Sequence, residues 1–439
     1  MERSGLFYRP VDGVCGDFIP YYEAPWYYLF YLKDFRDREK RGEGCPWYCV
    51  RSRDLLHWEE LGEMLPRGTA QEQDLFVYTG SVFRDIEGDG AYHIFYTGHN
   101  PYFKEKGKPQ EAILHAVSED LMHWKKDPEF RFLALEGYEP DDWRDPFVFR
   151  DEKNGRYAML VMARKDRGRA AGRGVTALCV SDDLKCWSGE KNLWEPDRYV
   201  THECGELFRM GEWWYLIYSE FSDRFRTRYV MAKSPEGPFF RPERDCFDSR
   251  AFYAAKTLWD GRKRYLFGWL ASREGEADSG NWQWGGNMLV HELYQKEDKS
   301  LAVRMPEAFR NRAELSLDFS FQMESENTEI RLWIPGRDGH PGYELLILPL
   351  EKKMALRTAG RLYPDPDFCG IETAAELNAG VWHRISILFQ ESCMAAYLDG
   401  QRAMSARLYG RGKGTIELRY DGERVLFSDL DIHEGGGAE

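Results

Sequence analysis

Apolar and polar residues alternate in paired runs along the first two thirds of the chain. Five times, a strand-like run is followed by a short turn and by a second run rich in aromatic residues, at residues 27–31, 92–96, 157–161, 214–218 and 265–269. Alternation with a period of two, broken by short turns, is typical of antiparallel β-hairpins. This part of the sequence therefore predicts five repeated hairpins.

The spacing of the hairpins indicates one repeated unit. Aligned on the second runs, successive copies are 65, 65, 57 and 51 residues apart, with equivalent positions at Phe30, Phe95, Leu160, Ile217 and Gly268. A second pattern, Ser-x-Asp-Leu-x-x-Trp, follows a short apolar run at residues 52–58, 118–124 and 181–187. Each unit thus contains four strands, and five such units closed in a ring predict a five-bladed β-propeller.

The repeat ends near Arg304, and the pattern changes from residue 314 onward. Short alternating strands without the blade pattern are predicted at residues 315–323, 328–334, 343–348, 382–389, 393–398 and 415–420. Such strands, separated by Asp-Gly turns, are typical of a β-sandwich. We therefore expect an all-β chain with a five-bladed β-propeller catalytic domain at 1–304, a linker at 305–313 and a C-terminal β-sandwich at 314–439.

Composition narrows the partners and the compartment. The 439 residues carry a net charge of −14, which argues against nucleic acid or an anionic membrane and is compatible with a small neutral carbohydrate. The nine cysteines have no framework spacing, and no signal peptide or membrane-spanning run precedes the first blade. We expect a cytoplasmic protein without cofactor or metal, and leave open whether it forms a homo-oligomer.

Candidate chemistry lies at the starts of the inner strands, which converge at one end of a propeller. When the five copies are registered there, the equivalent positions are Asp17, Thr79, Asp145, Cys204 and Ala254, and Glu203 stands one residue before its register point. Any one acid alone would be read as capping a turn or pairing with an Arg. Three acids that converge in one funnel instead indicate glycoside hydrolysis, in which two carboxyl groups flank the scissile bond.

Further candidates are weaker. Ser81 begins the inner strand of blade two and is a candidate donor to a sugar hydroxyl, or a turn serine. Trp47 and Tyr253 stand near strand mouths, where an aromatic face stacks on a sugar, or where it fills the blade core.

These residues together resemble glycoside hydrolase family 32, the invertases, fructanases and β-fructofuranosidases. The resemblance spans nearly the whole chain and is carried by Asp17, residues 78–81, Arg144-Asp145-Pro146, Glu203-Cys204, residues 252–254, Gly268-Trp269 and the trailing sandwich. It implies retaining hydrolysis of β-fructofuranosides by double displacement, with fructosyl transfer as a variant, and no cofactor. It also implies that Asp17 is the nucleophile and stays ionised, that Glu203 is the acid/base, and that Asp145 and Arg144 hold sugar hydroxyls.

The sequence departs from the family pattern beside Asp17. The family surrounds its nucleophile with Asn-Asp-Pro-Asn-Gly, whereas this chain has Gly16-Asp17-Phe18-Ile19-Pro20, and Leu32 stands where a glutamine is common. Two alternatives therefore remain beside a retaining fructosidase. One is an inverting furanosidase or pyranosidase of a related five-bladed family, acting on arabinosides or xylosides. The other is a carbohydrate-binding relative without turnover.

Overall fold

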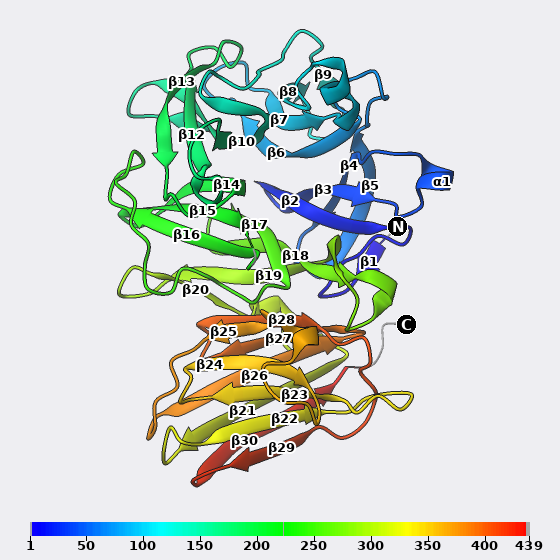
Figure 1. Ribbon diagram of the computed structural model, residues 1–439, viewed down its shortest axis with the longest axis vertical. Coiled ribbons are helices and arrows are strands. Elements are labelled where there is room, and N and C mark those ends of the chain that lie inside the picture. Colours follow the sequence, from blue (N-terminus) through cyan, green and yellow to red (C-terminus); the bar gives the residue numbers. More distant parts are fainter. Residues whose placement is uncertain (1, 223, 436–439) are drawn as a thin grey trace.

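The computed structural model describes residues 2–222 and 224–435, and the chain is built almost wholly of β-strands. Figure 1 shows two parts, with the N-terminal sheets arranged around an axis and the C-terminal strands stacked below them. The described helical elements are short: α1 (Arg38–Arg41), η1 (Pro101–Lys106), η2 (Ala170–Gly172), η3 (Glu274–Glu276), η4 (Glu307–Phe309) and η5 (Pro366–Phe368). The predicted fold class, a five-bladed propeller followed by a sandwich, is confirmed.

The first three blades are four-stranded antiparallel sheets, as the repeat predicts. Blade one consists of β2 (Val14–Glu23), β3 (Trp26–Asp34), β4 (Trp47–Ser52) and β5 (His57–Leu65), with β1 (Glu2–Ser4) added outside β5. Blade two consists of β6 (Phe76–Arg84), β7 (Tyr92–His99), β8 (Glu111–Ser118) and β9 (Lys125–Lys126). Blade three consists of β10 (Tyr138–Asp151), β11 (Arg156–Lys165), β12 (Gly174–Ser181) and β13 (Ser188–Trp194).

The last two blades differ from the predicted pattern. Blade four has three strands, β14 (Thr201–Met210), β15 (Trp213–Phe221) and β16 (Arg226–Ala232), and isolated bridges to Phe240 and Cys246 stand where a fourth would lie. Blade five consists of β17 (Phe252–Trp259), β18 (Arg264–Arg273), β19 (Trp282–Gln295) and β20 (Leu301–Arg304). β19 is one long strand that pairs with both β18 and β20. Blades one and five join where Gly286 pairs with Cys15.

Each inner strand carries a β-bulge at its mouth, and these bulges position the site. The pairing slips between Gly16 and Ile19 in β2, and the inner strand of every other blade slips at the equivalent place. The bulge residue has a left-handed backbone in four blades, with φ of 47° at Asp17, 56° at Asp145, 53° at Cys204 and 52° at Ala254. A bulge re-aims the side chain that it carries. The predicted register of the inner strands is confirmed. In the second strands one position differs, because the residue of blade five that is equivalent to Phe30 is Phe267 and not Gly268.

The C-terminal strands form two facing five-stranded sheets. One has the order β28-β27-β26-β21-β30, with β21 (Leu315–Met323), β26 (Trp382–Gln390), β27 (Cys393–Leu398), β28 (Arg402–Arg407) and β30 (Val425–Glu434). The other has the order β25-β24-β23-β22-β29, with β22 (Glu329–Ile334), β23 (Tyr343–Leu348), β24 (Lys353–Thr358), β25 (Glu372–Ala374) and β29 (Glu417–Asp421). The six predicted strands are present, and β24, β25, β28 and β30 were missed.

The sandwich is joined to the propeller by a buried polar contact and a shared apolar core. Asp248 accepts hydrogen bonds from the amide and hydroxyl of Ser405 and lies 2.9 Å from Nε2 of His291, whose other nitrogen is 3.0 Å from the Tyr397 hydroxyl. One apolar cluster runs from blades one, four and five into both sandwich sheets. We propose that the sandwich supports the propeller and keep the boundaries 1–304, 305–313 and 314–439 as a prediction.

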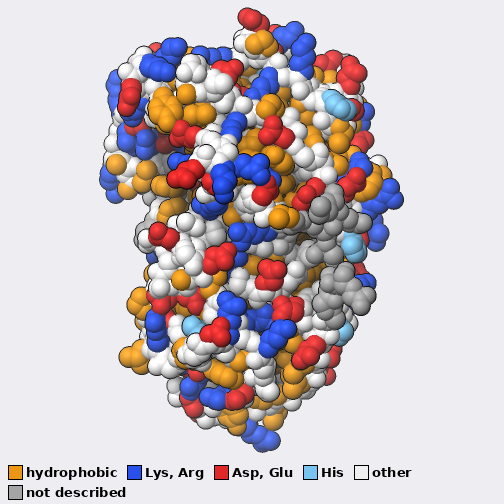
Figure 2. Space-filling view, turned by 90° about the vertical axis from the view of Figure 1, so that its right-hand side faces the viewer, with side chains coloured by type: hydrophobic (Ala, Val, Ile, Leu, Met, Phe, Trp, Pro, Cys, Tyr) orange, Lys and Arg blue, Asp and Glu red, His pale blue; other side chains and the backbone are white. Residues whose placement is uncertain are grey.

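On the face seen in Figure 2, Lys and Arg side chains alternate with Asp and Glu side chains. The negative net charge is therefore not concentrated in one patch on this face. Among the described residues, no helix is long and apolar enough to cross a membrane.

Candidate active site

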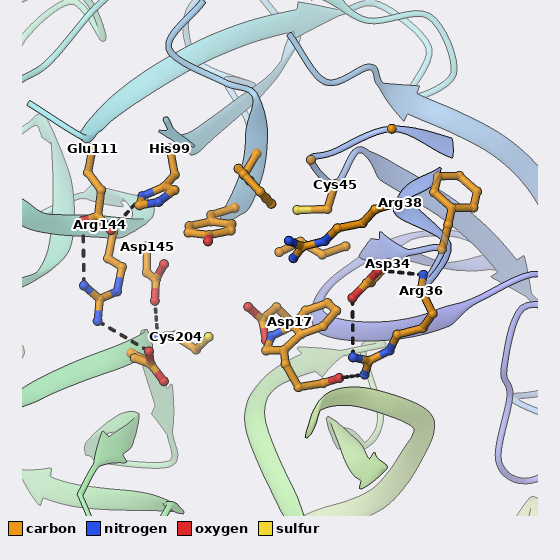
Figure 3. Close-up of a pocket in the computed structure, with 18 of the residues that line it drawn as sticks. Asp17, Asp34, Arg36, Arg38, Cys45, His99, Glu111, Arg144, Asp145 and Cys204 are labelled. Atoms are coloured by element: carbon orange, nitrogen blue, oxygen red, sulfur yellow. Dashed lines mark hydrogen bonds and ion pairs between the residues drawn. The ribbon is translucent and has the colours of Figure 1, made fainter. Parts of the chain in front are cut away.

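A cavity of about 480 Å³ opens at the mouth of the propeller axis. Three of the predicted acids, Asp17, Asp145 and Glu203, line it together with Arg144. They come from β2, β10 and β14, that is from blades one, three and four. Figure 3 shows Asp17 and Asp145 on opposite sides of the open space. The convergence predicted from the repeat register is therefore present.

Asp17 is fixed by the neighbouring blade. The Trp269 indole Nε1 on β18 donates a 3.0 Å hydrogen bond to Oδ1 of Asp17. Burial raises the pKa of Asp17 to about 7, and the charges of Asp145 and Glu203 raise it as well, while the Trp269 hydrogen bond lowers it. A carboxyl with a pKa near 7 exists in both its protonated and its ionised form near neutral pH, and the ionised nucleophile expected at Asp17 stays a prediction.

Asp145 is held from both sides. Its backbone amide donates to Oγ1 of Thr97 at 2.8 Å, and its Oδ2 accepts from the amide of Cys204 at 2.7 Å. Burial raises the pKa of Asp145 to about 6, against the lowering effects of Arg144 and of the Cys204 amide. The side chain is 3% exposed, so only its edge on the cavity is free to bind a ligand.

Glu203 has a partner on each carboxylate oxygen. Nη2 of Arg144 lies 3.4 Å from Oε1, and the Tyr253 hydroxyl donates to Oε2 at 2.6 Å. The same hydroxyl lies 3.4 Å from the carbonyl oxygen of Glu220. Burial raises the pKa of Tyr253 well above its usual value, so this hydroxyl keeps its proton. Tyr253, predicted as a stacking platform, instead contacts the acid through its hydroxyl.

Arg144 is the cation of the site. Its Nη1 lies 2.5 Å from Oδ1 of Asp142 and 3.7 Å from Oε2 of Glu111. Although burial opposes its charge, the surrounding carboxylates of Asp142, Glu111, Glu203 and Asp145 raise the pKa of Arg144 well above its usual value. The guanidinium therefore remains charged and partly offsets the acids.

Three predicted substrate contacts, Ser81, Trp47 and Tyr253, lie outside the wall of this cavity. The Ser81 hydroxyl, 3% exposed, accepts a 3.0 Å hydrogen bond from the amide of Val148 and so ties blade two to blade three. Trp47 is fully buried, and its Nε1 donates to the Tyr78 carbonyl. Trp47 thus fills the blade core, which was the structural alternative to sugar stacking. Ser81 lies inside β6 and is therefore not a turn serine, and its oxygen is used by a contact between two blades.

Several lining residues were not singled out from the sequence: Tyr78, His99, Glu111, Trp284, Arg36 and Arg38. His99 and Glu111 stand at the ends of β7 and β8 that face the mouth, where His99 pairs with Phe76 and with Glu111. The hairpin pairing that places the start of β6 at the mouth also places the end of β7 there. That signal was available in the sequence.

The departures beside Asp17 are built into the packing. A Cβ added at Gly16 would come 2.7 Å from the Trp284 ring, so the indole fills the place of a side chain there. Ile19 is buried, and Leu32 is buried in the cavity wall beside Cys45. Leu32 and Cys45 therefore form an apolar patch in a wall to which blade one also contributes the charged side chains of Asp34, Arg36 and Arg38.

One other acidic group has the spacing of a metal site. Ligand atoms of Asp85, Asp89 and His93 lie within 4.8 Å of one another. They lie at the far end of blade two from the cavity, and the Tyr157 hydroxyl contacts both Asp85 oxygens at 2.9 and 3.0 Å. These carboxylate oxygens already have a protein partner, and nothing connects this group to the acids at the mouth.

The site combines carboxyl groups with raised pKa values and a buried cation around a space of disaccharide scale. Such an arrangement supplies a nucleophile or base, an acid and a hydroxyl clamp, which is the equipment of a glycoside hydrolase. The model for the glycosyl hydrolases family 32 N-terminal domain matches residues 19–304. This match covers more than half of the chain, and the chain belongs to glycosyl hydrolases family 32. A model for the 3-keto-alpha-glucoside-1,2-lyase-like domain matches residues 254–433, which hold blade five and most of the sandwich.

Curated relatives and solved structures agree with this assignment. The chain is 24% identical to the sucrose-6-phosphate hydrolase of Escherichia coli over 399 residues, 83% of this chain and 80% of the relative. It is 25% identical to the levanbiose-producing levanase of Bacillus subtilis (strain 168) over 293 residues, and spans about half of that relative (51%). The fold matches sucrose-6-phosphate hydrolase from Lactobacillus gasseri with a TM-score of 0.79, at 18% identity and 99% and 93% coverage. It matches exo-inulinase from Aspergillus awamori with a TM-score of 0.77, at 17% identity and 99% and 98% coverage.

Proposed function

We propose that the protein is a retaining β-fructofuranosidase that acts on a small fructoside. The observation that carries the proposal is the meeting of Asp17, Asp145 and Glu203 at equivalent bulges around one cavity. The names of the relatives, which include sucrose-6-phosphate hydrolases and levanases, support a fructoside as substrate.

Each acid has a role that fits its surroundings. Asp17 is the nucleophile, since the only hydrogen bond to its carboxylate that the described residues show comes from Trp269 and leaves Oδ2 to the cavity. Glu203 is the acid/base, since the Tyr253 hydroxyl at its Oε2 also lies 3.4 Å from the Glu220 carbonyl oxygen and can either donate to Glu203 or accept from it. Asp145 holds sugar hydroxyls, with Arg144 beside it. A proton on Glu203 removes one negative neighbour of Asp17 and so favours its ionisation.

Stereochemistry tests the mechanism. NMR of the first-formed sugar should show the anomeric configuration of the substrate, because two displacements restore it. An inverted product would contradict the proposal and favour an arabinosidase or xylosidase of a related five-bladed family. Absence of turnover on sucrose, inulin-type and levan-type oligosaccharides and aryl arabinosides, with sugar binding intact, would favour the non-catalytic alternative.

A second candidate substrate is a fructoside whose leaving sugar carries a phosphate. Arg38 lines the cavity, and Figure 3 shows its side chain extending over the space beside Asp17. Among the described residues, no carboxylate lies within ion-pair distance of Arg38, whereas Arg36 pairs with Asp34 at 3.6 Å. A free guanidinium at the mouth of an acid-rich cavity favours an anionic group on the substrate.

Sucrose and sucrose-6-phosphate compared on Arg38→Gln test this candidate. We expect the variant to lose about 10- to 100-fold in kcat/KM on the phosphorylated sugar and little on sucrose, since one charge-assisted contact contributes about 1.5–3 kcal/mol. Arg41→Gln is the matched control, because Arg41 pairs with Asp12 at 3.1 Å. Equal kinetics of wild type and Arg38→Gln on both sugars would rule the candidate out.

A further inference from the structure

The polar contacts of the cavity are distributed unevenly around its wall. Leu32 and Cys45 of blade one form an apolar patch with Trp284 of blade five. The charged side chains of Asp34, Arg36 and Arg38, also from blade one, line the cavity as well. On the opposite side stand His99, Glu111 and Arg144 (Figure 3). A sugar in this cavity therefore meets an apolar patch at Leu32 and Cys45, and hydrogen-bonding groups on the opposite side.

His99 is held in place from two directions. Its ring stacks on Tyr78 with centroids 4.7 Å apart and an interplanar angle of 19°. Its Nδ1 is buried and lies 3.5 Å from Oε1 of Glu111. The Nε2 atom has no partner among the described residues. A ring fixed by stacking, with one nitrogen beside a carboxylate, presents its other nitrogen in a defined direction.

Glu111 is itself fixed by blade three. Its Oε2 accepts a 2.9 Å hydrogen bond from the amide of Trp143 and lies 3.7 Å from Nη1 of Arg144. The side chain is 4% exposed. Glu111 is thus a rigid link between His99 and the guanidinium that contacts Glu203.

We propose that His99 is a specificity-determining residue of this cavity: Nε2 of its ring hydrogen-bonds a sugar hydroxyl, and Glu111 is the positioning residue that orients the ring. The ligand class is a furanoside with a free hydroxyl on the side of blade two. At the apolar patch of Leu32 and Cys45, the same sugar tolerates loss or substitution of a hydroxyl, because neither side chain depends on that hydroxyl for a hydrogen bond. This inference rests on the proposed function and adds a residue that distinguishes one sugar from another by a hydrogen bond.

Monodeoxy analogues of the fructoside test the proposal. On the parent substrate, His99→Gln should lower kcat/KM by about tenfold, the loss expected when one buried hydrogen bond goes unmade. The loss should lie mainly in KM. On the one analogue that lacks the hydroxyl contacted by Nε2, wild type and His99→Gln should have equal kcat/KM. Glu111→Gln, which keeps an acceptor for the Trp143 amide, should give a smaller loss of the same kind.

Matched variants separate this effect from general damage. His123→Gln removes a histidine of the same blade that pairs with Asp120 at 2.7 Å on an exposed turn, and it should leave the kinetics unchanged. If His99→Gln equals wild type on the parent substrate, or loses the same factor on every analogue, the proposal is wrong. A wild-type protein that hydrolyses no fructoside would instead contradict the proposed function.

Discussion

The backbone amide of Cys204 donates a 2.7 Å hydrogen bond to Oδ2 of Asp145, so the bulge of blade four holds the acid of blade three. The other acids follow the same principle. Trp269 on blade five donates to Asp17 on blade one, and Tyr253 on blade five donates to Glu203 on blade four. Each carboxylate is oriented by an adjacent blade, and the active geometry therefore depends on closure of the ring.

Removing the donor to Asp17 should move the pH dependence of the reaction. The nucleophile must be ionised, so activity should rise with pH through the pKa of Asp17, which is raised to about 7. The Trp269 hydrogen bond lowers that pKa. In Trp269→Phe the acidic limb of the kcat/KM profile should therefore move upward by about one pH unit, or ~1.4 kcal/mol. Trp282→Phe, on the same blade, should leave the limb in place.

The three clustered carboxyl groups of Asp17, Asp145 and Glu203 should lower the free energy of unfolding at alkaline pH. Because the folded-state pKa of Asp17 is raised above its unfolded value of about 3.9, the folded protein binds more protons between these values, and stability falls as pH rises from about 4 to 7. Asp17→Asn should therefore raise Tm more at pH 8 than at pH 4, as thermal unfolding at the two pH values would show. Asp120→Asn should instead lower Tm to a similar extent at both pH values, since hydrogen bonds with His123 lower the pKa of Asp120 and its contribution is lost only below about pH 4. Equal Tm changes for Asp17→Asn at both pH values would contradict this.

The fold and the positions of the acids could be predicted from the sequence because both follow from a hairpin pattern that recurs in every blade. The five bulges are local features of hairpins, so Asp17, Asp145 and Cys204 could be placed in register from spacing alone. Contacts between blades do not repeat. The Trp284 ring against Gly16, and the Tyr253 hydroxyl on Glu203, join segments far apart in sequence and depend on how the sheets pack. Ser81 has the right residue type at the right mouth, but a neighbouring backbone amide uses its oxygen.

Ser81→Ala should affect stability and not substrate binding. The variant leaves the Val148 amide without its 3.0 Å acceptor in a buried place. An unsatisfied buried donor costs about 1–3 kcal/mol, so chemical denaturation should show a loss of that size. KM for the fructoside should stay at the wild-type value. An increase in KM with unchanged stability would restore Ser81 as a sugar contact.

The junction between propeller and sandwich should be sensitive to Asp248. This residue is 3% exposed and accepts from Ser405, Ser249 and His291. Asp248→Ala leaves these donors unpaired, and we expect a loss of about 3–5 kcal/mol in the free energy of unfolding. Denaturation followed separately by tryptophan fluorescence and circular dichroism would measure it. Separate transitions in the wild type and no loss in the variant would exclude a stabilising junction.

The Tyr253 hydroxyl should matter most when the leaving group needs a proton. It donates to Oε2 of Glu203 at 2.6 Å and lies 3.4 Å from the Glu220 carbonyl oxygen. The hydroxyl can therefore donate to an ionised Glu203, or turn its hydrogen to Glu220 and accept from a protonated one. Tyr253→Phe removes both options and leaves the ring in the core.

We expect Tyr253→Phe to lower kcat/KM on a fructoside with a sugar leaving group by about 10- to 100-fold, the range for a hydrogen bond to a charged group, about 1.5–3 kcal/mol. On an aryl fructoside whose phenolate departs without a proton, the first displacement needs no acid, and the loss should be much smaller. Glu203→Ala should also lose more kcat/KM on the fructoside with a sugar leaving group than on the aryl fructoside, and the difference between the two losses should be larger. If Tyr253→Phe loses the same factor on both substrates, the hydroxyl holds the sugar or the fold and does not serve the acid.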